Sequence, residues 1–370
     1  MVQLKKIVKT ILINVALTII LLLLLEGFSS IVLRASDTFF GNLVPERRHT
    51  QYDDELGWIN LPNLYLKDMY GPGNSFKTNS MSFRSDREVT SGVPAGKVRV
   101  LCSGDSFTMG YGVDNDEVWC QLLESKDNTI ESVNLGQGGY GIDQAYLWFK
   151  RNSPKLDFDV HVFAFITDDF NRMQSDMFNG FGKPFLALEN GLITNKYRPV
   201  PTLAYKFPRL PRIREGIDQL SSVTLLKKLL LPAATSSQNT QQPDDSSRQL
   251  VLKLFDDVRE TSSAKGSITV FVYLPKQSDY LHTESDPWRQ FLHERSSQTS
   301  RDGFCLIDLV DEIRKLPPQE IEGLFNQEAD FHYSEKGNQY VADVLFRKLL
   351  EIREIESKFQ QKLDQASYLR

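Results

Sequence analysis

A serine that follows a strand-like run is the first residue whose type and setting suggest chemistry. Residues 98–102 are mostly apolar and lead into Gly104, Asp105 and Ser106, after which a segment compatible with a helix begins. A serine at the carboxyl end of a buried parallel strand lies where open α/β sheets bind their ligands. Its own amide is then among the unpaired donors of a helix start and can face an oxyanion. Ser106 is therefore a candidate nucleophile, and the alternative is that Asp105 or Ser106 only caps the helix.

A serine nucleophile needs a base, and His332 is the histidine best placed to supply one. It lies in a turn-like segment just before the last helical pattern, whereas His161 lies inside a strand-like run and is expected in the core. Asp330 stands two residues before His332, and residues i and i+2 of an extended backbone share a face. We therefore predict that the Asp330 carboxylate orients the His332 imidazole. Taken alone, the segment is also typical of a solvated loop with a capping aspartate.

Strand-length and helix-length patterns alternate along the main part of the chain. The apolar runs of strand length are residues 98–102, 132–135, 160–166, 268–274 and 304–309. Their β-branched and aromatic content, without strict alternation, is typical of buried parallel strands. The helical patterns between them are residues 117–125, 143–152, 248–263 and 288–295. This alternation predicts βαβ units and a parallel sheet covered by helices on both faces.

The remaining segments divide the chain into regions of different composition. The boundaries that we expect are residues 1–34 for a membrane anchor, 35–95 for an irregular, partly β leader, 96–350 for the main domain and 351–370 for a helical extension. Within the main domain, residues 170–231 are expected to form an ordered lid or subdomain, and the polar residues 232–249 a flexible linker. The helical pattern over residues 341–363 either packs on the domain or serves self-association or membrane contact.

An uncharged apolar run near the N-terminus predicts the anchor. Residues 10–25 contain no charge, and with their apolar neighbours they reach about 19 residues, enough to cross a hydrocarbon core of ~30 Å. Lys5, Lys6 and Lys9 precede the run, so the positive-inside rule predicts a cytoplasmic N-terminus and a body on the periplasmic or extracellular side. A cleaved signal peptide is the alternative, but the run is long for one and no small-x-small cleavage motif follows it.

Composition and cysteine content exclude several classes of protein. The formal net charge of −5 at pH 7 argues against a nucleic-acid partner, which normally meets a basic stripe. A hydrophobic content of 41% and a charged content of 25% are ordinary for a globular protein and exclude a disordered or multi-spanning chain. Cys102, Cys120 and Cys305 are widely spaced and contain no CxxC pair, which predicts neither a disulfide framework nor a zinc site. We expect them to be buried thiols.

Four segments taken in order resemble the conserved blocks of the SGNH (GDSL-like) hydrolase family. Ser106 and the segment of Asp330 and His332 match the first and last blocks. Asn134 is followed five residues later by Gly139, as in the second block, and residues 166–169 align with a Gly-x-Asn-Asp block. The resemblance covers residues 95–350 and implies a three-layer α/β/α fold with a five-stranded parallel sheet of the flavodoxin-like kind. The leader is similar to one found on membrane-anchored members associated with cell-surface polysaccharides.

The resemblance also implies an activity. Ser106 is the expected nucleophile, His332 the base and Asp330 the group that orients it, while the oxyanion hole comprises the amides of Ser106 and Gly139 together with residue Asp168. The expected substrate is a short acyl ester, with an O-acetyl group on a glycan favoured, and neither a metal nor a cofactor is implied. Two alternatives remain: an O-acyltransferase with the same triad, and a catalytically weak glycan-binding or assembly protein. The sequence does not indicate an oligomeric state.

Position 168 departs from the family pattern. The family places an asparagine there, whose side-chain amide donates to the oxyanion, whereas this chain has Asp168. An ionised carboxylate would repel the developing charge, so either Asp168 stays protonated beside Asp169 or another donor, such as Asn171, takes the role. The Asp-x-His spacing at the last block is a second variation. A Gly-x-Ser-x-Gly motif is absent around Ser106, which disfavours an ordinary α/β-hydrolase.

Overall fold

A parallel sheet of five strands forms the centre of the computed structural model, which describes residues 2–39, 49–179, 181–201, 220–222, 225–226, 243–281, 286–298 and 303–368. Its strands are β5 (Val98–Ser103), β6 (Ile130–Asn134), β7 (Val160–Phe165), β12 (Ile268–Tyr273) and β13 (Leu306–Asp308). Their order in space is β13-β12-β7-β5-β6. Read from β6 to β13 and numbered along the chain, the order is 2-1-3-4-5, which is the flavodoxin-like order. In this order β5 and β7 flank the topological switch point.

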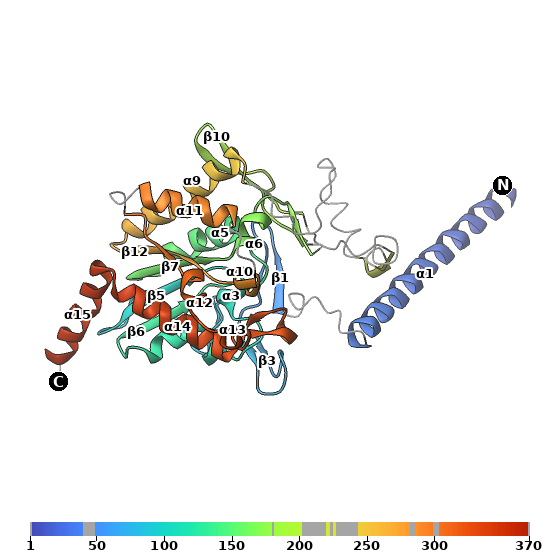
Figure 1. Ribbon diagram of the computed structural model, residues 1–370. Helices are drawn as coiled ribbons and strands as arrows, with labels where there is room; N and C mark the ends of the chain where they lie inside the picture. The colour runs from blue at the N-terminus through green and yellow to red at the C-terminus, as the bar shows by residue number, and fades with distance from the viewer. Residues whose placement is uncertain are drawn as a thin grey trace.

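Helices cover both faces of the sheet, which confirms the predicted three-layer fold class (Figure 1). The layer on one face comprises α5 (Ile142–Asn152), α6 (Thr167–Arg172), α9 (Asp245–Ser263) and α11 (Pro287–Gln298). The layer on the other comprises α4 (Trp119–Leu122), α12 (Val310–Ile313), α14 (Glu335–Leu350) and the start of α15 (Arg353–Tyr368). The apolar side chains of α9 recur every three or four residues and pack on Phe163 and Phe271, as expected for one face of an amphipathic helix.

Side chains of strand β5 pack into the hydrophobic cores on both faces of the sheet. Leu101 points into the core beneath α5 and α9, while Val100 and Cys102 point into the core beneath α4 and α14. Every residue of β5 is buried, and burying one such side chain contributes about 1.5–3 kcal/mol. The strand is therefore a rigid support for whatever follows its carboxyl end.

Short strands and helical turns complete the described chain. The paired strands are β1 (Thr50–Asp53) with β2 (Gly57–Asn60), β3 (Tyr65–Leu66) with β4 (Phe76–Lys77), β8 (Met177–Phe178) with β9 (Phe181–Gly182), β10 (Leu186–Glu189) with β11 (Leu192–Asn195), and β14 (Phe325–Asn326) with β15 (His332–Tyr333). The short helices are α3 (Ser106–Met109), α10 (Gln277–Leu281) and α13 (Pro318–Glu322), with 3-10 turns at Asn115–Glu117, Leu123–Ser125, Ser153–Lys155 and Gln327–Ala329.

The leader packs on the main domain through a buried arginine. Arg84 is fully buried, and its guanidinium donates to the side chain of Asn115 at 2.7 Å and to the carbonyls of Met109, Gly110 and Val113. These carbonyls belong to the end of α3 and the loop after it. The leader therefore holds the short helix that begins at Ser106.

The segment after α6 contains two β-hairpins, β8–β9 and β10–β11. A buried ion pair fixes its start, since Lys183 Nζ lies 2.5 Å from Asp143 Oδ2 on the first turn of α5 and both side chains are fully buried. Residues 170–172 of the expected insert belong to α6 instead. Its residues 180, 202–219, 223–224 and 227–231 lie outside the described part of the chain.

Two further boundaries differ from the sequence-based expectation. Residues 232–242 of the expected linker lie outside the described chain, but residues 245–249 form the first turn of α9, which Asp244 caps by accepting from the Ser247 amide at 2.7 Å. The helical pattern over residues 341–363 is divided between α14 and α15, with a break after Leu350. Ile355 and Phe359 of α15 are buried against the domain core.

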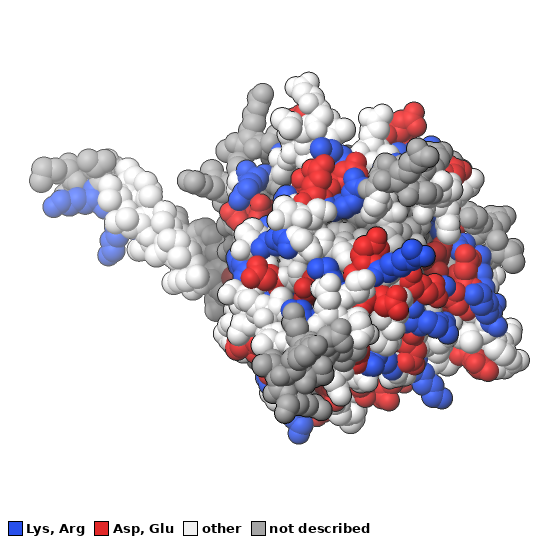
Figure 2. Space-filling model, turned by 90° about the vertical axis from the view of Figure 1, so that its left-hand side faces the viewer, with Lys and Arg blue, Asp and Glu red and all other residues white. Residues whose placement is uncertain are grey.

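The N-terminal helix α1 (Val2–Phe39) is long and apolar enough to cross a bilayer. Within its span from Lys5 to Val32, the most apolar stretch of 18 residues has a mean hydropathy of 2.6 and is not buried in the protein. Figure 2 shows basic side chains near the outer end of this helix and uncharged ones along the stretch that follows them. A transmembrane anchor and a signal sequence both have this character.

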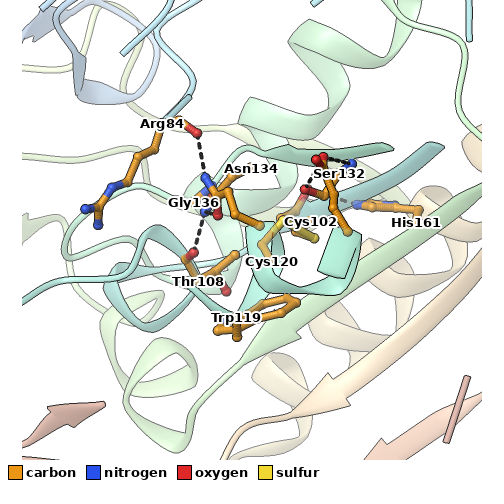
Figure 3. The surroundings of a disulfide bond; sticks show 12 residues. Arg84, Cys102, Thr108, Trp119, Cys120, Ser132, Asn134, Gly136 and His161 are labelled. Atoms are coloured by element: carbon orange, nitrogen blue, oxygen red, sulfur yellow. Dashed lines mark hydrogen bonds between the residues drawn. A yellow bond between two sulfur atoms is a disulfide. The ribbon is translucent and has the colours of Figure 1, made fainter. Parts of the chain in front are cut away.

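The cysteines correct one expectation. Cys102 in β5 and Cys120 in α4 form a disulfide with their Cα atoms 6.4 Å apart (Figure 3), so the prediction of three free thiols is wrong. The two residues are 18 positions apart in the chain, but α4 packs directly on the sheet beside β5. Cys305 is a free thiol, and burial raises its pKa to about 11.

Candidate active site

The turn from β5 into α3 places Ser106 at the carboxyl edge of the sheet, where 5% of the residue is exposed. Asp105 caps α3, because its Oδ1 accepts from the Phe107 amide at 2.9 Å. The capping role that the sequence allowed to either residue thus falls to Asp105, and the Ser106 hydroxyl can contact another group. Only glycine fits at position 104, since a Cβ there would lie 2.2 Å from Thr108 Oγ1 and 2.7 Å from the Ala164 carbonyl oxygen.

His332 reaches Ser106 from the other end of the chain. Its Nε2 lies 2.7 Å from Ser106 Oγ. The imidazole is held between two rings, with its centroid 4.5 Å from that of Phe107 and 4.8 Å from that of Tyr111. Strand β15 positions it by pairing with β14. The structure therefore brings the expected nucleophile and the expected base into contact.

The Ala329 carbonyl, and not the Asp330 carboxylate, contacts the far side of the imidazole. His332 Nδ1 lies 2.7 Å from the Ala329 oxygen, and a carbonyl can only accept a hydrogen bond. Nδ1 therefore carries the proton, which leaves Nε2 free to accept from the Ser106 hydroxyl. This is the tautomer that a general base requires.

Asp330 does not occupy the position expected from the sequence. Within the described residues it makes no hydrogen bond to His332. The expectation assumed an extended backbone, but Asp330 and Phe331 both have positive φ, 47° and 57°. Two consecutive left-handed residues form a turn, so residues 330 and 332 no longer share a face. Asp330 acts on His332 only as a nearby charge that favours the protonated imidazole.

Burial is the largest influence on the acidity of His332. It lowers the pKa of the imidazole below its usual 6.5, while the hydrogen bond to the Ala329 carbonyl and the charge of Asp105 act in the opposite direction. The positive charge of Arg172 adds to the lowering. His332 is therefore neutral near pH 7 and able to accept a proton.

The loop after β6 brings a second backbone amide to the same edge of the sheet. Asn134 fixes this loop to α3, because its Oδ1 accepts from the Gly136 amide at 2.9 Å and its Nδ2 donates to the Thr108 carbonyl at 2.8 Å (Figure 3). Gly139 has a φ of 72°, and a Cβ there would lie 2.4 Å from the Phe178 ring, so only glycine fits. Within the described residues, the amides of Ser106 and Gly139 donate to no protein acceptor. Both remain available for a ligand.

Asp168 has a charged partner that the sequence did not indicate. Its Oδ1 lies 3.0 Å from Lys276 Nζ, and both side chains are mostly buried. Burial raises the pKa of the neighbouring Asp169, and the charge of Asp105 adds to this effect. The side-chain oxygen and nitrogen of Asn171 are buried and have no protein partner among the described residues.

Sequence reasoning missed Arg172 and Lys276. A signal for the first was present, because buried carboxylates such as Asp105 and Asp169 require a cation nearby. Arg172 Nη1 lies 3.1 Å from Asp105 Oδ2 and 2.8 Å from Asp169 Oδ1. Lys276 lies just after β12, and no spacing rule connects it with Asp168.

A second serine–histidine contact lies deeper in the domain. Ser103 Oγ is 2.9 Å from His161 Nε2, but the two residues are 1% and 0% exposed. The His161 ring stacks on Phe149 with their centroids 4.0 Å apart, and burial lowers its pKa to about 3. A substrate cannot reach this pair, so we assign it to the core.

A serine in contact with a neutral histidine, with two free amides at the switch point of a flavodoxin-like sheet, comprises the groups that serine hydrolases use. No family model matches the sequence, and no curated protein matches it. Solved structures of lipolytic proteins are similar to the chain, at low identity.

A lipolytic protein of the G-D-S-L family from Desulfitobacterium hafniense is 15% identical, with a TM-score of 0.38 over 68% of this chain and 99% of that one. A member of the same lipolytic family from Veillonella parvula is 13% identical, with a TM-score of 0.39 over 69% and 98%. A lipase/acylhydrolase from Enterococcus faecalis is 13% identical, with a TM-score of 0.36 over 68% and 95%. These likenesses concern the fold.

Proposed function

We propose that this protein is a serine esterase of the SGNH type that removes a short acyl group from its substrate. The observation that carries the proposal is the contact of 2.7 Å between Ser106 Oγ and His332 Nε2. It occurs at the carboxyl edge of the sheet, where doubly wound folds bind ligands. The four sequence blocks that resemble the SGNH family lend further support.

The geometry is compatible with a two-step acyl transfer. Ser106 Oγ attacks the carbonyl carbon of the ester while His332 Nε2 takes its proton. The amides of Ser106 and Gly139 stabilise the negative oxygen of the tetrahedral intermediate. His332 then gives its proton to the leaving alcohol, and a water molecule activated by the same imidazole releases the acyl group as a carboxylate.

We further propose that the substrate is an acylated glycan, with O-acetyl as the acyl group. The family resemblance of the blocks and of the leader supports this choice, since fold alone does not specify a substrate. Phe178 packs against Gly139 and limits the room beside this amide, which favours a short acyl group.

We place the enzyme on the membrane, with α1 as an uncleaved anchor and the body on the extracytoplasmic side. The lysines before the apolar span support this orientation. The disulfide between Cys102 and Cys120 adds an independent argument, since disulfides form and persist in oxidising compartments. N-terminal sequencing of the mature protein tests the anchor, and a start near residue 36 would show that the helix had been removed.

Covalent labelling of the full-length protein in detergent tests the proposed nucleophile. A fluorophosphonate probe should label the wild type, and Ser106→Ala should abolish the labelling. Ser103→Ala is the matched control, because Ser103 lies three residues before Ser106 and its hydroxyl also contacts a histidine, His161. Labelling that survives in Ser106→Ala would overturn the assignment.

Product analysis then tests the reaction itself. Incubation with an acetylated oligosaccharide should release free acetate at a rate that an added acceptor glycan does not change. Acetate release that gives way to transfer when an acceptor is added would identify an acyltransferase. A folded protein that binds the glycan, takes no label and releases no acetate would instead be a binding protein.

A further inference from the structure

Arg172 occupies a central position beside the proposed active site. It is the last residue of α6, and its side chain is 13% exposed. A single nitrogen, Nη1, lies 3.1 Å from Asp105 Oδ2, 2.8 Å from Asp169 Oδ1 and 3.1 Å from the Tyr140 carbonyl oxygen. These partners come from three different segments, those that follow β5, β7 and β6.

Two of these contacts flank the proposed oxyanion donors. Asp105 immediately precedes Ser106, and Tyr140 immediately follows Gly139. The guanidinium thus connects the two backbone segments whose amides must point at one oxygen. A change of a few tenths of an ångström between such donors weakens their hydrogen bonds to the oxyanion.

The contact between Arg172 and Asp105 also weakens the hydrogen bond from Ser106 to Asp105, which competes with the one from Ser106 to His332. Asp105 Oδ2 lies 3.4 Å from Ser106 Oγ, while His332 Nε2 lies 2.7 Å from it. The guanidinium also contacts Asp105 Oδ2 and draws negative charge away from the hydroxyl. Without this cation, a buried carboxylate would stand uncompensated beside both the Ser106 hydroxyl and the developing oxyanion.

The guanidinium also supports the outer wall of the site. Its central carbon lies 5.1 Å from the centroid of the Phe178 ring, within the range of a cation–π contact. The edge of that ring packs on Gly139. Arg172 therefore acts on Gly139 from two sides, through Tyr140 and through Phe178.

We propose that Arg172 is a positioning residue that sets the spacing of the two oxyanion amides and keeps the Asp105 carboxylate from competing for the Ser106 hydroxyl. The inference rests on the proposed function, since it assigns a role within the same reaction. It adds a residue that no block of the sequence resemblance contains.

Kinetics of Arg172→Met in the full-length protein test the proposal. Loss of a well-placed oxyanion donor lowers kcat by about 10²–10³-fold, and we expect a loss of at least tenfold here with KM changed less than threefold. An Arg172→Met enzyme that keeps the wild-type kcat would overturn the inference. A wild type without esterase activity or label would refute the proposed function instead.

A pH profile separates the positioning role from a merely structural one. Asp105, Asp330 and the Ala329 carbonyl favour the protonated form of His332, whereas burial and Arg172 favour the neutral form. Removing the arginine therefore raises the pKa of His332. The acid limb of kcat/KM should move to higher pH in Arg172→Met and stay in place in Arg172→Lys, which keeps the charge but loses the planar geometry. A limb that does not move in Arg172→Met contradicts the inference.

Two further variants serve as controls for folding and coupling. Arg151→Met removes an arginine of similar burial that pairs with Asp53 and Glu55 on the leader, and it should lower the melting temperature without moving the acid limb.

Asp105→Asn, combined with Arg172→Met, completes a double-mutant cycle. Because the arginine acts through Asp105, its loss should cost less in the Asp105→Asn background. Strictly additive losses in kcat would contradict this coupling.

Discussion

Two serines three residues apart, at the end of β5 and at the start of α3, each contact a histidine, yet only one contact has the properties of a reactive pair. Their distances are nearly equal, 2.9 Å for Ser103 with His161 and 2.7 Å for Ser106 with His332. Ser103 is the last residue of β5, where its side chain points into the core against α5 and α9. Ser106 is the first residue of α3 and stands at the edge of the sheet.

The reactivity of a serine–histidine pair therefore depends more on its surroundings than on the distance between the two side chains. Full burial lowers the pKa of His161 to about 3, so this imidazole is too weak a base to take a proton from serine near pH 7. Burial also lowers the pKa of His332 below 6.5, but this imidazole has a fixed tautomer and lies beside free backbone amides. Variants of the two pairs and their neighbours test this contrast between Ser103 with His161 and Ser106 with His332.

Ser106→Ala should lower kcat/KM for a short acyl ester by at least about 10⁴-fold, because the nucleophile is lost. Ser103→Ala should change it less than about threefold, because a buried hydroxyl away from the site contributes mainly to stability, by about 1 kcal/mol. Initial rates with an acetyl ester, normalised to folded protein by circular dichroism, measure both values. Comparable losses of kcat/KM in the two variants would show that the two serine–histidine pairs do not differ in reactivity.

The pH dependence should report His332 and not His161. Since only neutral His332 accepts the serine proton, kcat/KM should fall tenfold per pH unit below the pKa of His332 and level off above it. That pKa lies below 6.5, so the rate should be nearly constant around pH 7. A midpoint above pH 7 would show that the imidazole is not the buried, neutral group described above.

Asp168→Asn should raise kcat by up to about tenfold, because a side-chain amide donates where a carboxylate cannot. In this variant Lys276 no longer faces a carboxylate at position 168. Its companion Lys276→Met should lower kcat, since it leaves Asp168 without its partner at 3.0 Å. If both variants match the wild type, the ion pair lies outside the reach of the oxyanion.

Asp330→Asn should have the smallest effect, a loss of less than about tenfold. An aspartate that orients a catalytic histidine contributes about 10⁴-fold, but here the Ala329 carbonyl contacts Nδ1. The steady-state rates of Asp330→Asn and wild type across pH give the comparison. A loss near 10⁴-fold would mean that the Asp330 carboxylate replaces the carbonyl during turnover.

The sheet could be predicted from the sequence because its strands are buried on both faces. Such strands appear as continuous apolar runs, and the predicted run 98–102 differs from β5 by one residue. Ser106 could be singled out by its position after such a run, and His332 by its place just before the last helical pattern. A family resemblance supported both choices. Their contact, and that of Cys102 with Cys120, depends on how distant segments pack, which local patterns do not encode.

The misplacement of Asp330 has a local cause. Spacing rules assume a regular backbone, and two successive residues with positive φ are uncommon enough that no spacing rule anticipates them. Arg172 was missed for a different reason. Its importance comes from three acceptors on separate segments, and only the folded chain brings these together.

The order in which the chain is made has a consequence for when this site can exist. Ser106 and His332 are separated by 226 residues, and at about 5–20 residues per second their synthesis is roughly 11–45 s apart. The nucleophile therefore emerges long before its base. Throughout that interval the growing polypeptide carries a serine without its base, so the serine cannot attack an ester. The proposed activity therefore begins only after residue 332 has been made and has reached Ser106.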